Sequence, residues 1–62
     1  MIKIIVERDY QGKLQIGTMH NGVWHYADLP ADITTKQAIE TLIASKAQGK
    51  EYIITYSAQV DD

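Results

Sequence analysis

Few residues of this chain combine a reactive side chain with a spacing that could support chemistry. His20 and His25 flank a predicted hairpin turn, and on one face of that hairpin they would lie diagonally, about 7–8 Å apart. Two imidazoles could begin a metal site, but a third ligand is required and no carboxylate clearly shares their face. We therefore interpret them as surface histidines, and we expect neither a metal nor a cofactor.

The hydroxyl side chains of this sequence do not predict a catalytic site either. Nothing in the sequence brings Thr55 or Ser57 together with a histidine base and a group to orient it. A chain of 62 residues also seldom builds the apolar pocket that catalysis requires. We expect a protein that is not an enzyme and has no small-molecule substrate.

Aromatic side chains are the remaining candidates. Tyr52 and Tyr56 alternate with other residues along one segment, and Trp24 and Tyr26 do so along another. Such a row could stack on bases or pack on a partner. It is equally typical of a half-buried strand whose tyrosine hydroxyls reach the sheet edge. The elements that hold these residues decide between the two.

Four segments have the alternation or β-branched composition of strands, at residues 2–8, 13–19, 23–27 and 51–57. The first two are joined by a turn sequence at residues 9–12. The next two are joined by Asn21-Gly22, the strongest short hairpin signal. The final strand follows a helix.

One amphipathic helix is predicted between the third and fourth strands. Thr34 is a suitable N-cap, with Gln37 three positions later to complete a capping box and Ile33 placed for a hydrophobic staple. Gly49 is a natural stop. Between them runs an apolar stripe at helical spacing, formed by Ala38, Ile39, Leu42, Ile43 and Ala47.

These elements predict an α+β domain with the order β-β-β-α-β. Two tight hairpins make the first three strands antiparallel neighbours, and a right-handed crossover places the last strand parallel to the first. The predicted sheet order is 3-2-1-4, with one helix packed on one sheet face. The domain spans residues 1–58, and the tail at 59–62 is expected to fray.

Strand register decides which side chains share a face. The Asn21-Gly22 turn pairs His20 with Val23, and a three-residue loop ending at Gly12 pairs Val6 with Ile16. One face then carries aliphatic side chains that match the helix stripe. The other face carries the residues that we predict to bind a partner, which are Ile5, Met19, Trp24 and Tyr26.

A four-residue first loop is the alternative. It would move Ile2, Ile4 and Val6 to the Trp24 face, where the helix would cover the aromatic side chains. The high average burial of tryptophan supports this aromatic core. We favour the aliphatic core, but in either register apolar side chains remain on the uncovered face. We therefore expect a homo-oligomer or a protein partner.

The composition and charge of the chain argue against several other classes of protein. Cysteine is absent, which excludes disulfides and thiolate zinc sites and fits a reducing compartment. No signal peptide or membrane-length apolar run is visible, so we expect a cytoplasmic protein without a membrane partner. The net charge of −2, with both signs scattered, argues against a nucleic-acid surface. A small nucleic-acid-binding or regulatory protein, of phage or plasmid origin, remains the alternative function.

One short segment resembles a known family. The Asp28-Leu29-Pro30 loop, followed by a helix that carries Ala38 and Ile39, resembles the N-terminal domain of HicB-type antitoxins. In that family a strand usually lies between the tripeptide and the helix, whereas here the helix follows at once. No functional residue is carried over from this resemblance.

Overall fold

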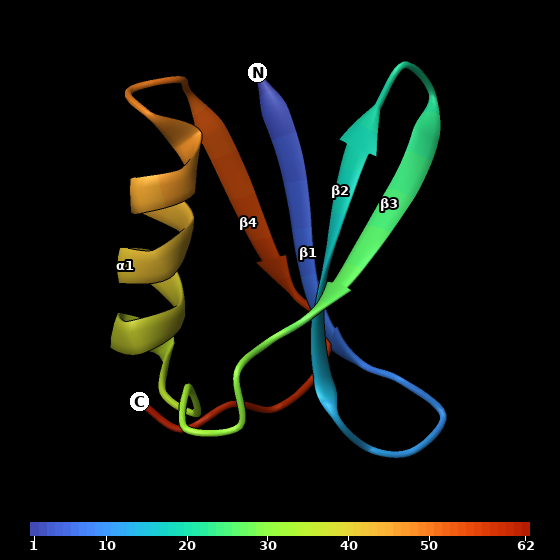
Figure 1. Cartoon of the computed structure of the whole chain (residues 1–62), viewed down its shortest axis with the longest axis vertical. Coiled ribbons are helices and arrows are strands. Elements are labelled where there is room, and N and C mark those ends of the chain that lie inside the picture. The colour runs from blue at the N-terminus through green and yellow to red at the C-terminus, as the bar shows by residue number, and fades with distance from the viewer.

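The computed structural model describes residues 1–62 and contains one four-stranded sheet and one helix (Figure 1). Strands β1 and β4 are parallel, and the other two neighbouring pairs are antiparallel, in the order β3-β2-β1-β4. The predicted α+β fold and its strand order are confirmed. The elements are β1 (Ile2–Arg8), β2 (Leu14–His20), β3 (Val23–Asp28), α1 (Lys36–Ala47) and β4 (Tyr52–Tyr56).

Both hairpin turns have the geometry that their residues predict. Asn21 and Gly22 take φ values of 52° and 79°, and His20 pairs with Val23. In the first loop, Gly12 takes φ 80° and the N–H of Asp9 donates to the carbonyl of Lys13 at 2.8 Å. The loop thus has three residues.

That loop length determines the register of the whole sheet. Val6 pairs with Ile16, and Ile4 pairs with Thr18. The aliphatic-core register is therefore confirmed and the aromatic-core alternative is wrong. One side of the sheet presents Ile4 and Val6 to α1, whereas Trp24 points to the opposite side.

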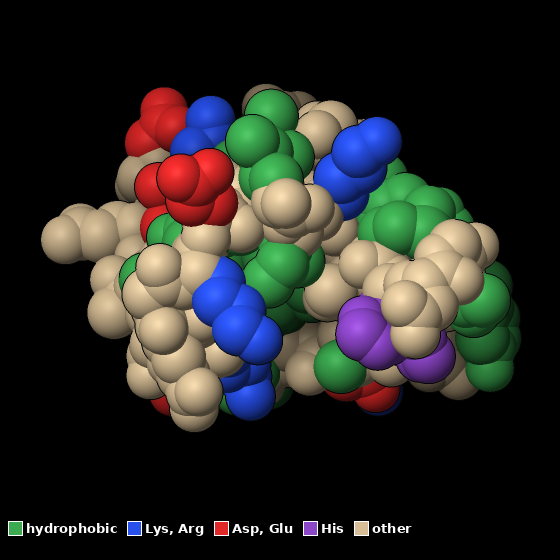
Figure 2. Space-filling view, turned by 90° about the horizontal axis from the view of Figure 1, so that it is seen from above, with side chains coloured by type: hydrophobic (Ala, Val, Ile, Leu, Met, Phe, Trp, Pro, Cys, Tyr) green, Lys and Arg blue, Asp and Glu red, His purple; other side chains and the backbone are tan.

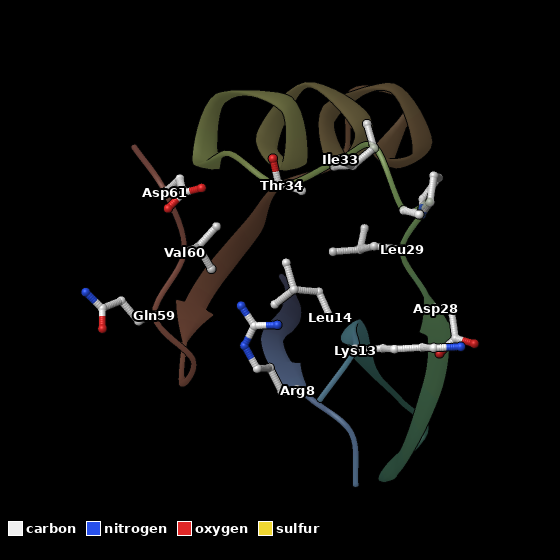
Figure 3. A pocket seen from close by; sticks show the side chains of 12 residues that line it. Arg8, Lys13, Leu14, Asp28, Leu29, Ile33, Thr34, Gln59, Val60 and Asp61 are labelled. Atoms are coloured by element: carbon white, nitrogen blue, oxygen red, sulfur yellow. The ribbon is translucent and has the colours of Figure 1, made fainter. Parts of the chain in front are cut away.

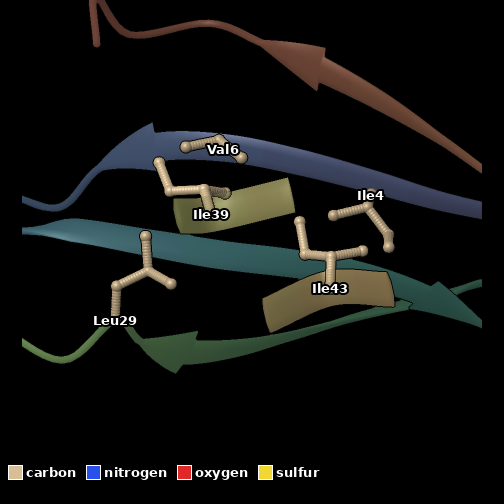
Figure 4. Close-up of a cluster of buried hydrophobic side chains, with 5 residues drawn as sticks. All are labelled: Ile4, Val6, Leu29, Ile39 and Ile43. Carbon is tan, nitrogen blue, oxygen red and sulfur yellow. The ribbon is translucent and has the colours of Figure 1, made fainter. Parts of the chain in front are cut away.

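The hydrophobic core forms between this aliphatic face and α1 (Figure 4). Val6 and Ile39 are completely buried, and Ile4 and Ile43 are almost so. Leu29, which follows β3 in a loop, joins the same cluster because the backbone N–H of Leu29 still bonds to the carbonyl of Leu14 at 3.1 Å. The predicted helix stripe is thus the one that contacts the sheet.

The helix begins one residue later than predicted. Thr35, not Thr34, is the N-cap, and its Oγ1 accepts the N–H of Ala38 at 3.2 Å. Gln37 consequently lies only two residues after the cap, so the predicted capping box does not form. Thr35 has the extended backbone angles typical of an N-cap residue, and it forms a parallel bridge to Asp61 of the C-terminal segment.

That bridge also involves the segment at 59–62, which we expected to fray. The N–H of Lys36 donates to the carbonyl of Asp61 at 2.7 Å, and Lys36 Nζ lies 3.3 Å from Asp62 Oδ1. Val60 packs against the core cluster. The structure therefore shows a docked tail where the sequence predicts a free one.

Coverage by the helix is uneven across the sheet. In Figure 1 α1 lies on the side of β4, and β3 lies at the far side of the sheet. A helix is roughly 10 Å across, whereas four strands span about 14 Å from axis to axis. The β3 residues on the helix side are accordingly exposed, and those on the other side of the strand are exposed as well.

Candidate functional site

The candidate site is the sheet surface that faces away from α1. We call it the open face. Strand alternation and the observed register place eleven residues on it, which are Lys3, Ile5, Glu7, Gln15, Gly17, Met19, Trp24, Tyr26, Asp28, Ile53 and Thr55.

The end of the open face beside the β2–β3 turn is apolar. Met19 pairs with Trp24 at one edge of the sheet, and Ile53 pairs with Lys3 at the other. Because Ile4 pairs with Thr18, Lys3 lies opposite Met19 and completes a row across all four strands. Trp24 is 37% exposed and Ile53 is 52% exposed, so the row offers large apolar surface to solvent.

In the middle of the open face, the side chains of Ile5 and Tyr26 pack over Gly17. A Cβ atom built on Gly17 would lie 2.8 Å from Ile5 Cγ2 and 2.8 Å from Tyr26 Cε1. The Tyr26 ring therefore lies across β2, as the pairing of Tyr26 with Gly17 predicts. Gly17 is buried beneath this contact, while Tyr26 itself remains 54% exposed.

The opposite end of the open face is acidic and polar. Glu7 pairs with Gln15, and Gln15 pairs with Asp28. The Gln15 side-chain amide donates to Glu7 Oε2 at 3.1 Å, which holds both side chains flat against the sheet. The open face is thus apolar at one end and acidic at the other.

All four residues that the sequence predicts as partner-binding lie together here. Trp24 and Tyr26 are exposed, and Ile5 and Met19 are half-buried. The sequence analysis missed Ile53, since it considered only the two tyrosines of that strand, Tyr52 and Tyr56, as candidates for a contact surface. The signal was available, because a strand whose even positions face the helix must present Ile53 on the other side.

The tyrosines of β4 lie on the helix side, in agreement with the half-buried interpretation. Tyr56 Oη donates to Glu40 Oε2 at 2.7 Å, and Lys36 Nζ lies 5.4 Å from the Tyr56 ring centroid. Burial, together with this hydrogen bond and the charge of Glu40, raises the pKa of Tyr56 from 10.0 to about 12. This contact attaches the helix to β4 and offers no stacking surface.

The histidines and hydroxyls do not form a reactive group. The rings of His20 and His25 lie 6.0 Å apart between centroids, on the face opposite to Thr55. No three His, Cys, Asp or Glu side chains lie together as a metal site would require. The Ser57 hydroxyl donates to the carbonyl of Val6 at 3.3 Å. Seen from above in Figure 2, the two histidine side chains lie next to each other at the surface.

A cavity of about 470 Å³ lies where the β3–α1 loop meets the C-terminal segment (Figure 3). Its floor is apolar, with Leu14, Leu29 and Val60. Two cations and two carboxylates are mixed around its rim, and Arg8 Nη1 is already engaged by the carbonyl of Gly12 at 2.7 Å. This mixed rim selects no class of ligand.

The helix of this chain is neither long nor apolar enough to cross a membrane. Comparison with protein-family models, with curated proteins and with solved structures finds no match.

Proposed function

We propose that this chain is a non-catalytic interaction module that binds a protein surface through its open face. One observation carries the proposal: Trp24, Tyr26 and Ile53 are each more than a third exposed on a single sheet face. Exposed apolar surface of this kind usually marks an interaction site. Tryptophan and tyrosine are also the residues that most often anchor protein interfaces.

The charge of the open face favours a protein over a nucleic acid. Lys3 is its one cation, and Glu7 and Asp28 occupy the other end. Binding to a phosphate backbone depends on several cations on one surface. A partner that presents apolar side chains beside neutral or basic ones matches the open face better.

The proposal also covers the absence of catalysis and the cellular compartment. Every buried side chain is apolar, so the polar groups that catalysis would use stand in solvent or in structural hydrogen bonds. The absence of cysteine fits the cytoplasm, which we propose as the compartment.

Site-specific photocrosslinking tests the binding surface. A photoreactive phenylalanine analogue placed at Tyr26 in cells that express the chain should give a defined crosslinked protein adduct. The same analogue at Ser45, an exposed position on α1, is the matched control and should give none. Equal crosslinking from the two positions, or adducts from Ser45 alone, would contradict the proposal.

A further inference from the structure

We propose that the occupant of the open face is a second copy of this chain, packed sheet against sheet around a two-fold axis. The axis runs parallel to the strands, between β1 and β2. This inference rests on the proposed function and names the partner. It follows from what the two-fold rotation places opposite each row of the open face.

The rotation exchanges the two halves of the sheet. It sets β3 of one copy over β4 of the other, and β2 over β1, because the strand order is β3-β2-β1-β4. In the apolar row, Trp24 then lies over Ile53 of the second copy. Both side chains are exposed in the single chain, so each would cover the other.

Met19 lies over Lys3 of the second copy in the same row. The methylene chain of a lysine can cover apolar surface while its ammonium group reaches solvent at the edge. Lys3 of one copy does not face Lys3 of the other. The only cation of the open face is thus accommodated without repulsion.

The other rows also match. Tyr26 lies over Thr55 of the second copy, and each brings a hydroxyl that can donate or accept. Glu7 lies over Gln15 of the second copy, whose amide already donates to a Glu7 carboxylate within one chain. The acidic ends of the two copies meet in this row, but no carboxylate lies directly over another, and the row lies at the rim of the interface, where solvent screens the charges.

A two-fold axis at right angles to the strands gives a poorer match. It would place Lys3 opposite Glu7 of the second copy, but it would also place Trp24 opposite Asp28. An ion pair at a surface contributes little to association. Burial of an aromatic ring against a carboxylate also forfeits the apolar contact, so the axis parallel to the strands is preferred.

The size of the open face determines the strength of the dimer. Four strands and three rows cover roughly 19 by 20 Å, or about 400 Å² on each copy. The two copies together would bury about 800 Å², below the roughly 1,200 Å² of a standard stable interface. We therefore expect a dimer that forms reversibly, at micromolar to millimolar concentration.

An intermolecular nuclear Overhauser effect tests the arrangement directly. Within one chain β3 and β4 are three strand spacings apart, about 14 Å, which is too far for a contact between Trp24 and Ile53. A mixture of isotope-labelled and unlabelled protein should nevertheless show a cross-peak between the Trp24 ring and an Ile53 methyl group.

Sedimentation velocity over a concentration series supplies the second measurement. Trp24→Ala should weaken self-association by at least ~10-fold, because it removes the largest apolar side chain of the row. Val23→Ala is the matched control, since Val23 is 57% exposed on the other face of the same strand. It should leave the dissociation constant unchanged, and far-ultraviolet circular dichroism confirms that both variants fold.

The possible failures separate the two proposals. A chain that stays monomeric up to millimolar concentration overturns the second copy as occupant, but not the open face as a binding surface. Self-association at full strength in Trp24→Ala, with intermolecular contacts elsewhere, also overturns the second copy as occupant, whereas equal crosslinking from Tyr26 and Ser45 overturns the open face as a binding surface. Loss of the dimer in Lys3→Glu with recovery in the Lys3→Glu, Glu7→Lys double variant overturns the axis parallel to the strands.

Discussion

Replacement of Gly17 by alanine probes the centre of the open face. The new methyl group would lie 2.8 Å from Ile5 Cγ2 and 2.8 Å from Tyr26 Cε1, whereas carbon atoms in contact normally lie about 3.5–4.0 Å apart. At least one neighbour must move by roughly 0.7 Å, from the difference between these distances. The Tyr26 ring is the more exposed of the two and is expected to tilt away from β2.

The magnitude follows from two opposing effects. Overpacking of this kind lowers the free energy of unfolding by about 1–3 kcal/mol. Replacement of glycine by alanine within a strand raises the free energy of unfolding by about 0.5–1 kcal/mol, because alanine loses less conformational freedom on folding than glycine does. Gly17→Ala should therefore lower the free energy of unfolding by roughly 0.5–2 kcal/mol. For a domain of this size, each 1 kcal/mol lowers the midpoint of thermal unfolding by about 4–8 °C.

A double-mutant cycle in urea assigns the loss to Tyr26. In the Tyr26→Ala background only Ile5 opposes the new methyl group, so Gly17→Ala should destabilise the domain by about 1 kcal/mol less than in the original chain. Equal effects in the two backgrounds, or a stabilised Gly17→Ala variant with the ring still over β2, would refute the packing of the Tyr26 ring on Gly17. The same variant should also weaken self-association, because the tilted ring disrupts the middle row.

Three further predictions concern the elements that hold the sheet and helix together. Thr35→Ala should lower the free energy of unfolding by about 0.5–2 kcal/mol because it removes the N-cap, whereas Thr34→Ala should change it little. Equal losses on urea denaturation would contradict the cap. Ultraviolet titration should detect one tyrosine, Tyr56, with a pKa of about 12, and Glu40→Gln should move that pKa back toward 10.0. Since the folded state favours the neutral phenol, this stabilisation is complete below pH ~10 and disappears as the pH rises through about 12. Removal of residues 59–62 should accelerate amide exchange in the first turn of α1, and unchanged exchange would show that the tail does not protect it.

Local signals in the sequence were sufficient for the strand order and for the register of the second hairpin, and they favoured one of two registers for the first. Asn21-Gly22 and the three-residue loop at residues 10–12 each determine a pairing register by their own backbone geometry. Since side chains alternate strictly along a strand, those two registers determine which residues share a face. Ile5, Met19, Trp24 and Tyr26 could therefore be grouped from turn and strand patterns alone, and the fold brings them together.

Features that depend on distant segments could not be derived in this way. The N-cap at Thr35 depends on a bridge to Asp61, twenty-six residues later in the chain. Leu29 is buried because the loop after β3 continues along β2. The residues of the loop do not by themselves predict this continued pairing. The register that sets Ile53 opposite Lys3 likewise depends on how β4 pairs with β1, fifty residues earlier in the chain.

The sequence by itself determined the order of the elements and the register of the β2–β3 hairpin, because turn geometry and strand alternation act over a few residues. Only the tertiary structure decided which face α1 covers, how little of β3 it reaches and where the C-terminal segment docks. Those outcomes depend on competition among apolar surfaces that are far apart in the chain, and a single helix covers only one of the two sheet faces, so the aromatic face stays uncovered.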